Sequence, residues 1–396
     1  MWTDSLGNPV TVSSDASLAA VNDFVEGFIG SEARAANVIE AATHDESAMV
    51  QAYAGAVHMF AESRDAAGHA RPFIDKAKAA AAQATPREQR FIEAVGAWAD
   101  GDVARAAQLH EDQAKQFPRD LASLKLGQYH LFNMGDAHSM LRIAMHAWDA
   151  ARDVPFFHGM LAFGFEQCHR LHEAERAARK AIAMRRKEPW AHHALAHVML
   201  TQGRNREGHD FMQSVSDTWT GLNSFMVTHN WWHQALFAIE LGDHAEVLRL
   251  YDTQVWGVAK EYSQDQVNAV SLLARLELAG VDVGERWQDV ARYLATRTSD
   301  HVLPFLDVQY LYGLARAGRG EADELMANIE QQEGRVWQEV ALPAARGLLA
   351  HARGDYKAAA EDLGRALPRM QEIGGSHAQR DLFTRVQRHA AQSSAR

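Results

Sequence analysis

The segment GDVARAA at residues 101–107 belongs to a pattern that recurs along the chain and decides its fold. Related text stands at 169–178 (HRLHEAERAA), 242–247 (GDHAEV) and 354–360 (GDYKAAA). Gly-Asp favours a turn, and the small residue five positions after Gly101 and Gly354 allows two helices to pack closely. The copies predict one repeated unit, made of two helices joined by a short turn.

Turn-like positions divide the chain at nearly regular intervals. They are Gly30, Ser63, Gly101, Gly135, His169, Gly203, Gly242, Gly280, Gly318 and Gly354. The nine intervals are 33, 38, 34, 34, 34, 39, 38, 38 and 36 residues. A period near 34 is typical of the tetratricopeptide repeat, in which each helix pair buries its apolar face against the next. An irregular helical bundle with accidental spacing is the alternative.

We therefore expect an all-α fold, a tetratricopeptide-like helical-repeat solenoid of about ten helix pairs. The solenoid should span residues 15–390, after an N-terminal arm at 1–14 and before a frayed C-terminus at 391–396. More than roughly 65% of the residues should be helical, with essentially no sheet.

Composition narrows the classes of function. Apolar residues make up 47% of the 396 residues and charged residues 23%, which is typical of a folded chain with a sizeable core. The net charge of −11 argues against nucleic acid or an anionic membrane as the main partner. A single cysteine, Cys168, excludes an intramolecular disulfide. The chain shows neither a signal-peptide pattern nor a run of about 18 apolar residues, so we expect a cytoplasmic protein.

Two histidine pairs stand out in the middle of the chain. The run EPWAHHALAHVMLTQGR begins at residue 188, and THNWWHQALFAIELGD begins at residue 228. Residues four apart share one face of a helix, and packed helices lie about 8–10 Å apart. Neighbouring helices would thus bring four imidazoles and two indoles to one concave surface, from Trp190, His193, His197, His229, Trp232 and His233. His192 and Trp231 should turn into the packing layer instead.

Four converging imidazoles are open to more than one use. They could hold a divalent metal, since imidazole is a common ligand of such ions, or they could be hydrogen-bonded in a polar groove. An imidazole with a carboxylate partner can also act as a general base, and Asp307 in PFLDVQYLYG is the candidate partner. A hydrogen bond at a helix start or between helices is the alternative for Asp307. The sequence assigns no cofactor.

Five segments resemble the tetratricopeptide-repeat protein 38 family, in a bacterial-type form. They are WAHHALAHVM from 190, THNWWHQALFAIELGD from 228, GVDVGERWQDVARY from 280, DHVLPFLDVQYLYGL from 300 and GGSHAQRDLF from 374. The resemblance implies a tetratricopeptide-like solenoid and an intracellular protein, and it implies no particular reaction. The matching positions are Trp190, His193, His197, His229, Asn230, Trp232, His233, Asp307, Arg380 and Asp381. The chain departs from the family pattern at His192, Gln309 and His377.

These arguments give one candidate site with two sets of residues. The expected catalytic residues are His193, His197, His229, His233 and Asp307. The expected ligand-binding residues are Trp190, Asn230, Trp232, Tyr310, Arg380 and Asp381. Arg380 could hold a carboxylate through two hydrogen bonds, or form an ion pair with Asp381 or a neighbouring helix. The tryptophans could equally be core residues.

Two functions stay open. In the first, the concave pocket binds a small molecule and supports acid–base or metal-assisted hydrolytic chemistry. In the second, the solenoid is a non-enzymatic scaffold for a peptide or a protein partner. A surface rich in histidine and tryptophan favours the small molecule over a peptide. A homo-oligomer is compatible with either function.

Overall fold

The computed structural model describes residues 2–395. Helices account for 75% of the chain, with 22 α-helices and one two-stranded sheet in the described part, which confirms the all-α prediction. Met1 and Arg396, at the outer ends of the predicted arm and tail, lie outside the described residues.

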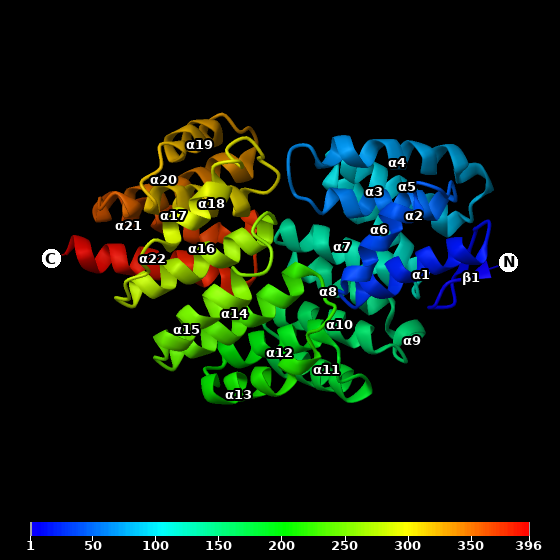
Figure 1. Ribbon diagram of the computed structural model, residues 1–396, viewed down its shortest axis with the longest axis horizontal. Coiled ribbons are helices and arrows are strands. Elements are labelled where there is room, and N and C mark those ends of the chain that lie inside the picture. Colours follow the sequence, from blue (N-terminus) through cyan, green and yellow to red (C-terminus); the bar gives the residue numbers. More distant parts are fainter. Residues whose placement is uncertain (1, 396) are drawn as a thin grey trace.

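Ten helix pairs follow one another along the chain (Figure 1). The first five are α1 (Asp15–Ile29) with α2 (Asn37–Ala41), α3 (Ala48–Met59) with α4 (Ala66–Ala80), α5 (Pro86–Ala99) with α6 (Val103–Gln116), α7 (Leu121–Asn133) with α8 (Ala137–His146), and α10 (Pro155–Gln167) with α11 (Leu171–Met184). The next five are α12 (Pro189–Thr201) with α13 (Asn205–Val215), α14 (Ser224–Glu240) with α15 (His244–Leu250), α16 (Ser263–Leu278) with α17 (Arg286–Leu294), α18 (Pro304–Arg316) with α19 (Glu321–Glu330), and α20 (Leu342–Ala352) with α21 (Tyr356–Ala366). The short α9 (Trp148–Ala151) lies between two pairs, and α22 (His377–Ser394) follows the last.

The turns within the pairs fall where the sequence predicts them. Eight of the ten predicted positions have positive φ, and at the other two the positive φ falls one residue away, at Ser31 and Glu62. His169 adopts φ 55° although it carries a side chain, which places it in the left-handed region that favours glycine. The sequence period is therefore the spacing of left-handed turns between paired helices.

The first helix of each middle pair is buried nearly all round, whereas the second is buried along one face. In α12 every residue from Ala191 to Met199 is buried. In its partner α13 the buried residues are Gly208, Met212 and Val215. The inner helices are enclosed on every side because the solenoid bends back on itself.

The solenoid is closed by contacts between segments far apart in the sequence. The main chain of residues 31–33 pairs with residues 221–223, through Ala33 N–H to the Gly221 carbonyl and Asn223 N–H to the Ser31 carbonyl, both 2.9 Å. The loop after α3 reaches α16, where Ser263 Oγ and Gln264 Nε2 donate to Glu62 Oε2 at 2.6 and 2.7 Å. Figure 1 shows the N-terminal pairs on the right and the C-terminal pairs on the left, with the middle pairs below them. The hydrogen bonds of Glu62 connect the N-terminal and C-terminal groups of pairs. The concave surface expected from the sequence is therefore bordered by segments from both ends of the repeat array.

Both predicted loose ends are ordered. Strands β1 (Trp2–Thr3) and β2 (Pro9–Val10) form an antiparallel hairpin in place of the expected arm, because Leu6 and Val10 are buried against the first helices. Residues 391–394 continue α22 in place of the expected frayed tail, since Val386 and Ala390 on that helix are buried. In the described part of the chain, no helix combines the length and the apolar character needed to cross a membrane.

Replacing Glu62 by Ala should destabilise the closed solenoid. The Glu62 carboxylate is 1% exposed and also accepts a hydrogen bond from Tyr129 Oη at 2.9 Å, so its loss leaves three donors from both sides of the closure without a partner. We expect the free energy of unfolding, measured in urea, to fall by about 2–4 kcal/mol. Glu46→Ala, at an exposed loop position, is the matched control and should change it by less than about 0.5 kcal/mol. Equal effects of the two variants would show that the Glu62 contacts do not hold the closure.

Candidate functional site

Side-chain caps fix the start of both histidine helices. The Glu188 carboxylate accepts the backbone N–H of Ala191 at the N-terminus of α12, and Asn223 Oδ1 accepts that of Met226, at 2.9 Å, at the N-terminus of α14. These caps satisfy backbone donors that have no partner within the helix. They also set which residues of each helix face its neighbour.

The two helices bring the four predicted histidines together in the interior. Ring nitrogens of His193, His197, His229 and His233, one from each, all lie within 4.8 Å of one another. Nε2 of His193 lies 3.0 Å from Nε2 of His197. The His233 ring centroid lies 4.5–4.9 Å from those of the other three. Each of the four side chains is at most 2% exposed. We call this set the four-histidine cluster.

Hydrogen bonding within the cluster is incomplete. Nδ1 of His229 lies 3.0 Å from Oδ1 of Asn268, and Nδ1 of His197 lies 3.5 Å from Oε1 of Glu166. Nδ1 of His193 and both ring nitrogens of His233 are buried without a partner. An unsatisfied buried polar group typically costs about 1–3 kcal/mol. The cluster therefore carries more nitrogen donors and acceptors than the fold alone uses.

Burial favours the neutral form of three of these imidazoles, those of His193, His229 and His233. Desolvation lowers the pKa of His229 to about 3, and it takes the pKa values of His193 and His233 well below their ordinary range. For Glu166 burial alone would raise the pKa, but His197 and Gln167 outweigh it and leave the carboxyl pKa below its usual value. A neutral imidazole has a free lone pair, so it can accept a proton or bind a metal.

A cavity of about 460 Å³ adjoins the cluster. His193, His229 and Trp190 form part of its wall. The wall also contains large apolar side chains, those of Phe24, Phe28, Val57, Phe60, Phe132, Met140, Phe163, Phe225 and Met226. The size and the apolar lining are those of a small-molecule site.

Lys125 is a half-buried cation in the wall of the cavity. Its Nζ donates to the carbonyls of Phe28 (2.8 Å) and Ile29 (3.1 Å) and to Oγ of Ser31 (3.0 Å), and it lies 5.2 Å from the Trp190 ring centroid. Burial lowers the Lys125 pKa to about 8, an effect that the neighbouring Glu188 carboxyl opposes. These bonds hold the ammonium group at one side of the cavity.

Glu188 lies behind the cavity wall and is fully buried. Burial raises its carboxyl pKa to about 8. Gly159 makes room for this carboxyl, because a Cβ atom there would stand 2.6 Å from Oε2 of Glu188. A substitution at Gly159 would therefore displace the carboxyl that caps α12.

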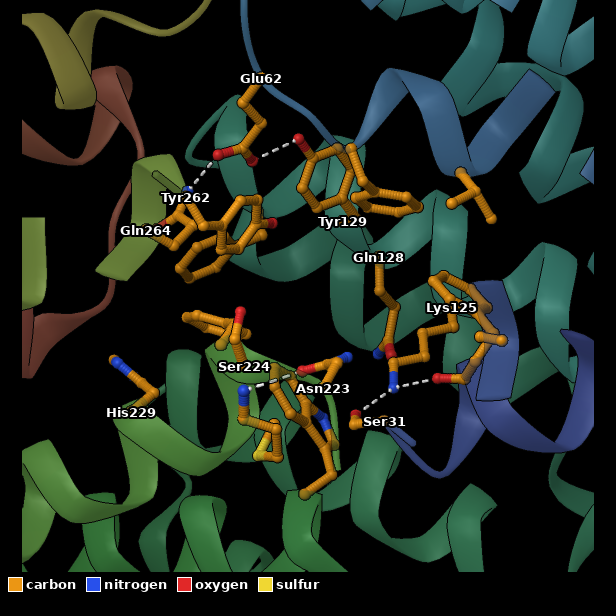
Figure 2. Close-up of a pocket in the computed structure, with 18 of the residues that line it drawn as sticks. Ser31, Glu62, Lys125, Gln128, Tyr129, Asn223, Ser224, His229, Tyr262 and Gln264 are labelled. Carbon is orange, nitrogen blue, oxygen red and sulfur yellow. Dashed lines mark hydrogen bonds between the residues drawn. The ribbon is translucent and has the colours of Figure 1, made fainter. Parts of the chain in front are cut away.

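A second polar group closes another end of the cavity. Figure 2 shows Glu62 with Tyr129 and Gln264 there, away from Lys125 and Ser31, with His229 on a further side. Burial raises the pKa of Glu62, which its three hydrogen-bond donors partly offset. Polar groups thus converge on an apolar space from three directions.

The predicted ligand-binding residues of α12 and α14 do not all reach this space. Trp190 lines the cavity, as expected. Trp232 is fully buried behind the cluster, stacked on His229 with ring centroids 5.0 Å apart and planes 9° apart. Asn230 is also buried, with Nδ2 3.5 Å from the Pro189 carbonyl. His197 and His233 lie in the same deeper layer, because an inner helix of a closed solenoid is covered on more than one face.

Four further predicted residues, on α18 and α22, also lie outside the cavity lining. Asp307 is buried and pairs with His301, whose Nδ1 is 2.6 Å from Oδ2 of Asp307, so its partner is not one of the four predicted histidines. Tyr310 is fully buried near it on α18. Arg380 contacts His377 and lines a separate cavity of about 290 Å³, while Asp381 pairs with Arg385 and Arg275.

Lys125, Glu62, Tyr129 and Gln264 also line the cavity, although their sequence pattern does not predict it. These residues come from α7, α16 and the loop after α3, and only the closure of the solenoid brings them together. One feature of the sequence points to Lys125. It is the single Lys or Arg in the mostly apolar helical segment LASLKLGQYHLF at 121–132. A half-buried lysine needs hydrogen-bond acceptors, which Phe28, Ile29 and Ser31 provide here.

His192 packs away from the cluster, as expected. Its Nδ1 accepts a hydrogen bond from Nε1 of Trp219 at 3.2 Å, and its side chain is fully buried. Trp231 is half-buried and makes an edge contact with Trp219, with ring centroids 4.9 Å apart. Of the two adjacent tryptophans, Trp232 is the deeper one.

Replacing His192 by Gln should weaken the acid sensitivity of the fold. Burial lowers the His192 pKa to about 4, below its ordinary value of about 6.5, so the unfolded chain takes up this proton first as the pH falls. The stability linked to His192 is complete above pH 6.5 and is lost towards pH 4, at about 1.4 kcal/mol per pH unit. Gln keeps an acceptor for Trp219 and does not titrate.

We expect the slope of unfolding free energy against pH, measured in urea between about pH 6 and 4, to fall by about one proton in His192→Gln. His172→Gln, at an exposed position, is the control and should leave the slope unchanged. Unchanged slopes in both variants would contradict the inferred protonation of His192.

No family model matches this chain. One similar solved structure is described as the Cut9–Hcn1 hetero-tetramer of APC/C, with 12% identity, a TM-score of 0.44, and coverage of 96% of this chain and 79% of that one. Another is the P58(IPK) TPR domain, with 13% identity, a TM-score of 0.23, and coverage of 79% of this chain and 100% of that one. Its paired helices and regular turns make this chain a tetratricopeptide-like helical-repeat protein.

Proposed function

We propose that the protein binds a small organic molecule in the cavity between α1, α3, α7, α12 and α14. The observation that carries this proposal is the partly open cavity of about 460 Å³, whose size lies within the range of small-molecule sites. Because the closing contacts are made by buried groups such as Glu62, the space is a built feature of the fold.

The wall chemistry indicates the class of ligand. Phenylalanine rings and Trp190 suit an aromatic or aliphatic body, which would bury apolar area against them. Polar atoms at Asn223, Ser224 and Gln128 can fix its orientation by hydrogen bonds. A molecule with an apolar body and a few polar substituents fits this distribution.

Acid–base chemistry, if the ligand undergoes any, belongs at the wall formed by His193 and His229. These are the two cluster imidazoles that line the cavity, and burial keeps both neutral near pH 7. Either ring can accept a proton from a ligand group within hydrogen-bond reach. Asp307 takes no part in this proposal, because its partner is His301.

The repeat architecture favours a scaffold for a peptide or a protein as the second candidate. Stacked helix pairs commonly present an extended concave surface to such partners. In this chain the contacts at Glu62 narrow that surface, so a peptide would bind on the outer helices or after opening these contacts. From the resemblance of its sequence, we also propose that the protein belongs to the tetratricopeptide-repeat protein 38 family. Membership of this family favours neither of the two candidate functions.

Filling the cavity should abolish ligand binding. Val57 lines the cavity and is half-buried, so Val57→Trp places an indole in the free space, while Val258→Trp makes the same change at a surface position that is 48% exposed. In native mass spectrometry of the purified protein we expect a bound small molecule in the wild type and in Val258→Trp. Its occupancy should fall at least about tenfold in Val57→Trp.

Equal occupancy in both tryptophan variants would place the ligand outside this cavity. A wild-type protein that carries a peptide and no small molecule would support the scaffold instead. Melting curves of the three proteins show whether Val57→Trp retains its fold.

A further inference from the structure

The four-histidine cluster has the donor set of a metal site. It holds two i, i+4 pairs on neighbouring helices, and nitrogens from all four rings lie within 4.8 Å of one another. Zinc–nitrogen bonds of about 2.0–2.1 Å in a tetrahedron place the nitrogens roughly 3.3–3.4 Å apart. The Nε2 atoms of His193 and His197 are already 3.0 Å apart, which is close to that spacing.

Buried ring nitrogens without hydrogen-bond partners also favour a metal site. Both nitrogens of His233 are fully buried and have no hydrogen-bond partner. A purely structural polar cluster would pair them with nearby donors or acceptors, as Asn268 does for His229. His233 stands within 5 Å, ring centroid to ring centroid, of each of the other three histidines, which is where a shared ligand of all four would satisfy it.

Two groups outside the cluster can hold the ligating rings. Metal-bound histidines usually donate their other ring N–H to a carboxylate or a carbonyl, which fixes the tautomer and the ring orientation. Oε1 of Glu166 lies 3.5 Å from Nδ1 of His197 and has no hydrogen-bond donor of its own. Oδ1 of Asn268 lies 3.0 Å from Nδ1 of His229. Both contacts leave Nε2 of the histidine for the ion.

We propose that His193, His197, His229 and His233 bind one divalent transition metal ion of the zinc class. Neutral imidazoles suit zinc, copper, nickel and iron, whereas magnesium and calcium prefer oxygen ligands, which this cluster does not offer within its own set. The buried Glu166 carboxylate offsets part of the charge of the ion. Arg275, the nearest cation behind Trp232, lies 5.8 Å from the indole centroid and pairs with Asp381 at 3.5 Å.

The ion would be reached through the cavity. His193 and His229 belong to the cavity wall, and His197 and His233 stand behind them. The metal proposal does not depend on the ligand proposal, because His233 takes part in the metal site and does not line the cavity. Val57→Trp, in turn, alters the cavity and leaves all four rings unchanged.

Zinc alone is the probe for the test. The full-length protein is treated with a chelator, dialysed and titrated with Zn²⁺ by calorimetry. We expect one ion per chain. The X-ray absorption spectrum of the zinc-loaded protein should show four imidazole nitrogens at about 2.0–2.1 Å. A stoichiometry of zero, or a first shell of oxygen ligands typical of an adventitious ion only, would overturn the proposal.

Variants separate the cluster from surface histidines. His233→Ala removes one ligand and should weaken zinc binding by more than about 100-fold, and Glu166→Gln should weaken it by about 10- to 100-fold. His172→Ala, at an exposed position, should have no effect. Equal affinity of wild type and His233→Ala would overturn the proposal. Circular dichroism shows whether each variant folds, and the absorption spectrum of the wild type decides the outcome for any variant that does not.

Val57→Trp distinguishes failure of this inference from failure of the proposed function. If the metal site exists and the ligand proposal is wrong, Val57→Trp and the wild type bind zinc equally and neither carries a small molecule. If the cavity binds a ligand and the cluster holds no metal, the small molecule is present in the wild type and zinc binding is absent.

Discussion

The buried carboxylate of Glu62 joins two parts of the repeat array that lie about 200 residues apart, and the interior depends on this closure. A tetratricopeptide-like array normally leaves its inner helices facing a groove. Here Ser263 and Gln264 on one side and Tyr129 on the other donate to a single carboxylate, while residues 31–33 and 221–223 pair through their main chains. The inner helices consequently pass through a water-poor interior along most of their length.

Such an interior changes the chemistry of ordinary residues. Desolvation holds His229 neutral down to about pH 3, lowers the pKa of Lys125 to about 8, and raises that of Glu188 to about 8. The same burial leaves both nitrogens of His233 without hydrogen-bond partners. Neutral imidazoles and side chains with shifted pKa values around an apolar space are features of binding sites. Here both result from the closure of the solenoid.

The fold was predictable because its signal is local and repeated. A left-handed turn recurs every 31 to 39 residues, and Gly-Asp marks four of these turns, at Gly101, Gly135, Gly242 and Gly354. The four histidines were also predictable as a set, since i, i+4 spacing fixes a helix face. The burial of Trp232 behind the histidines and the pairing of Asp307 with His301 were not predictable from the sequence. Both depend on which helix covers the inner face after the solenoid closes. The same holds for Lys125 and Glu62, which reach the cavity from distant segments.

The position of α14 connects the cavity to the stability of the whole chain. One hydrophobic core extends from the N-terminal hairpin to Met226 and Phe237, and a second begins at Trp232 and continues to Val386. Helix α14 contributes to both, and His229 and His233 lie on it between the residues that enter each core. Whatever occupies the space beside these rings therefore contacts the helix that the two cores share. A ligand bound there would stabilise the contact between the two cores. A ligand that binds only the folded state raises the free energy of unfolding of the protein.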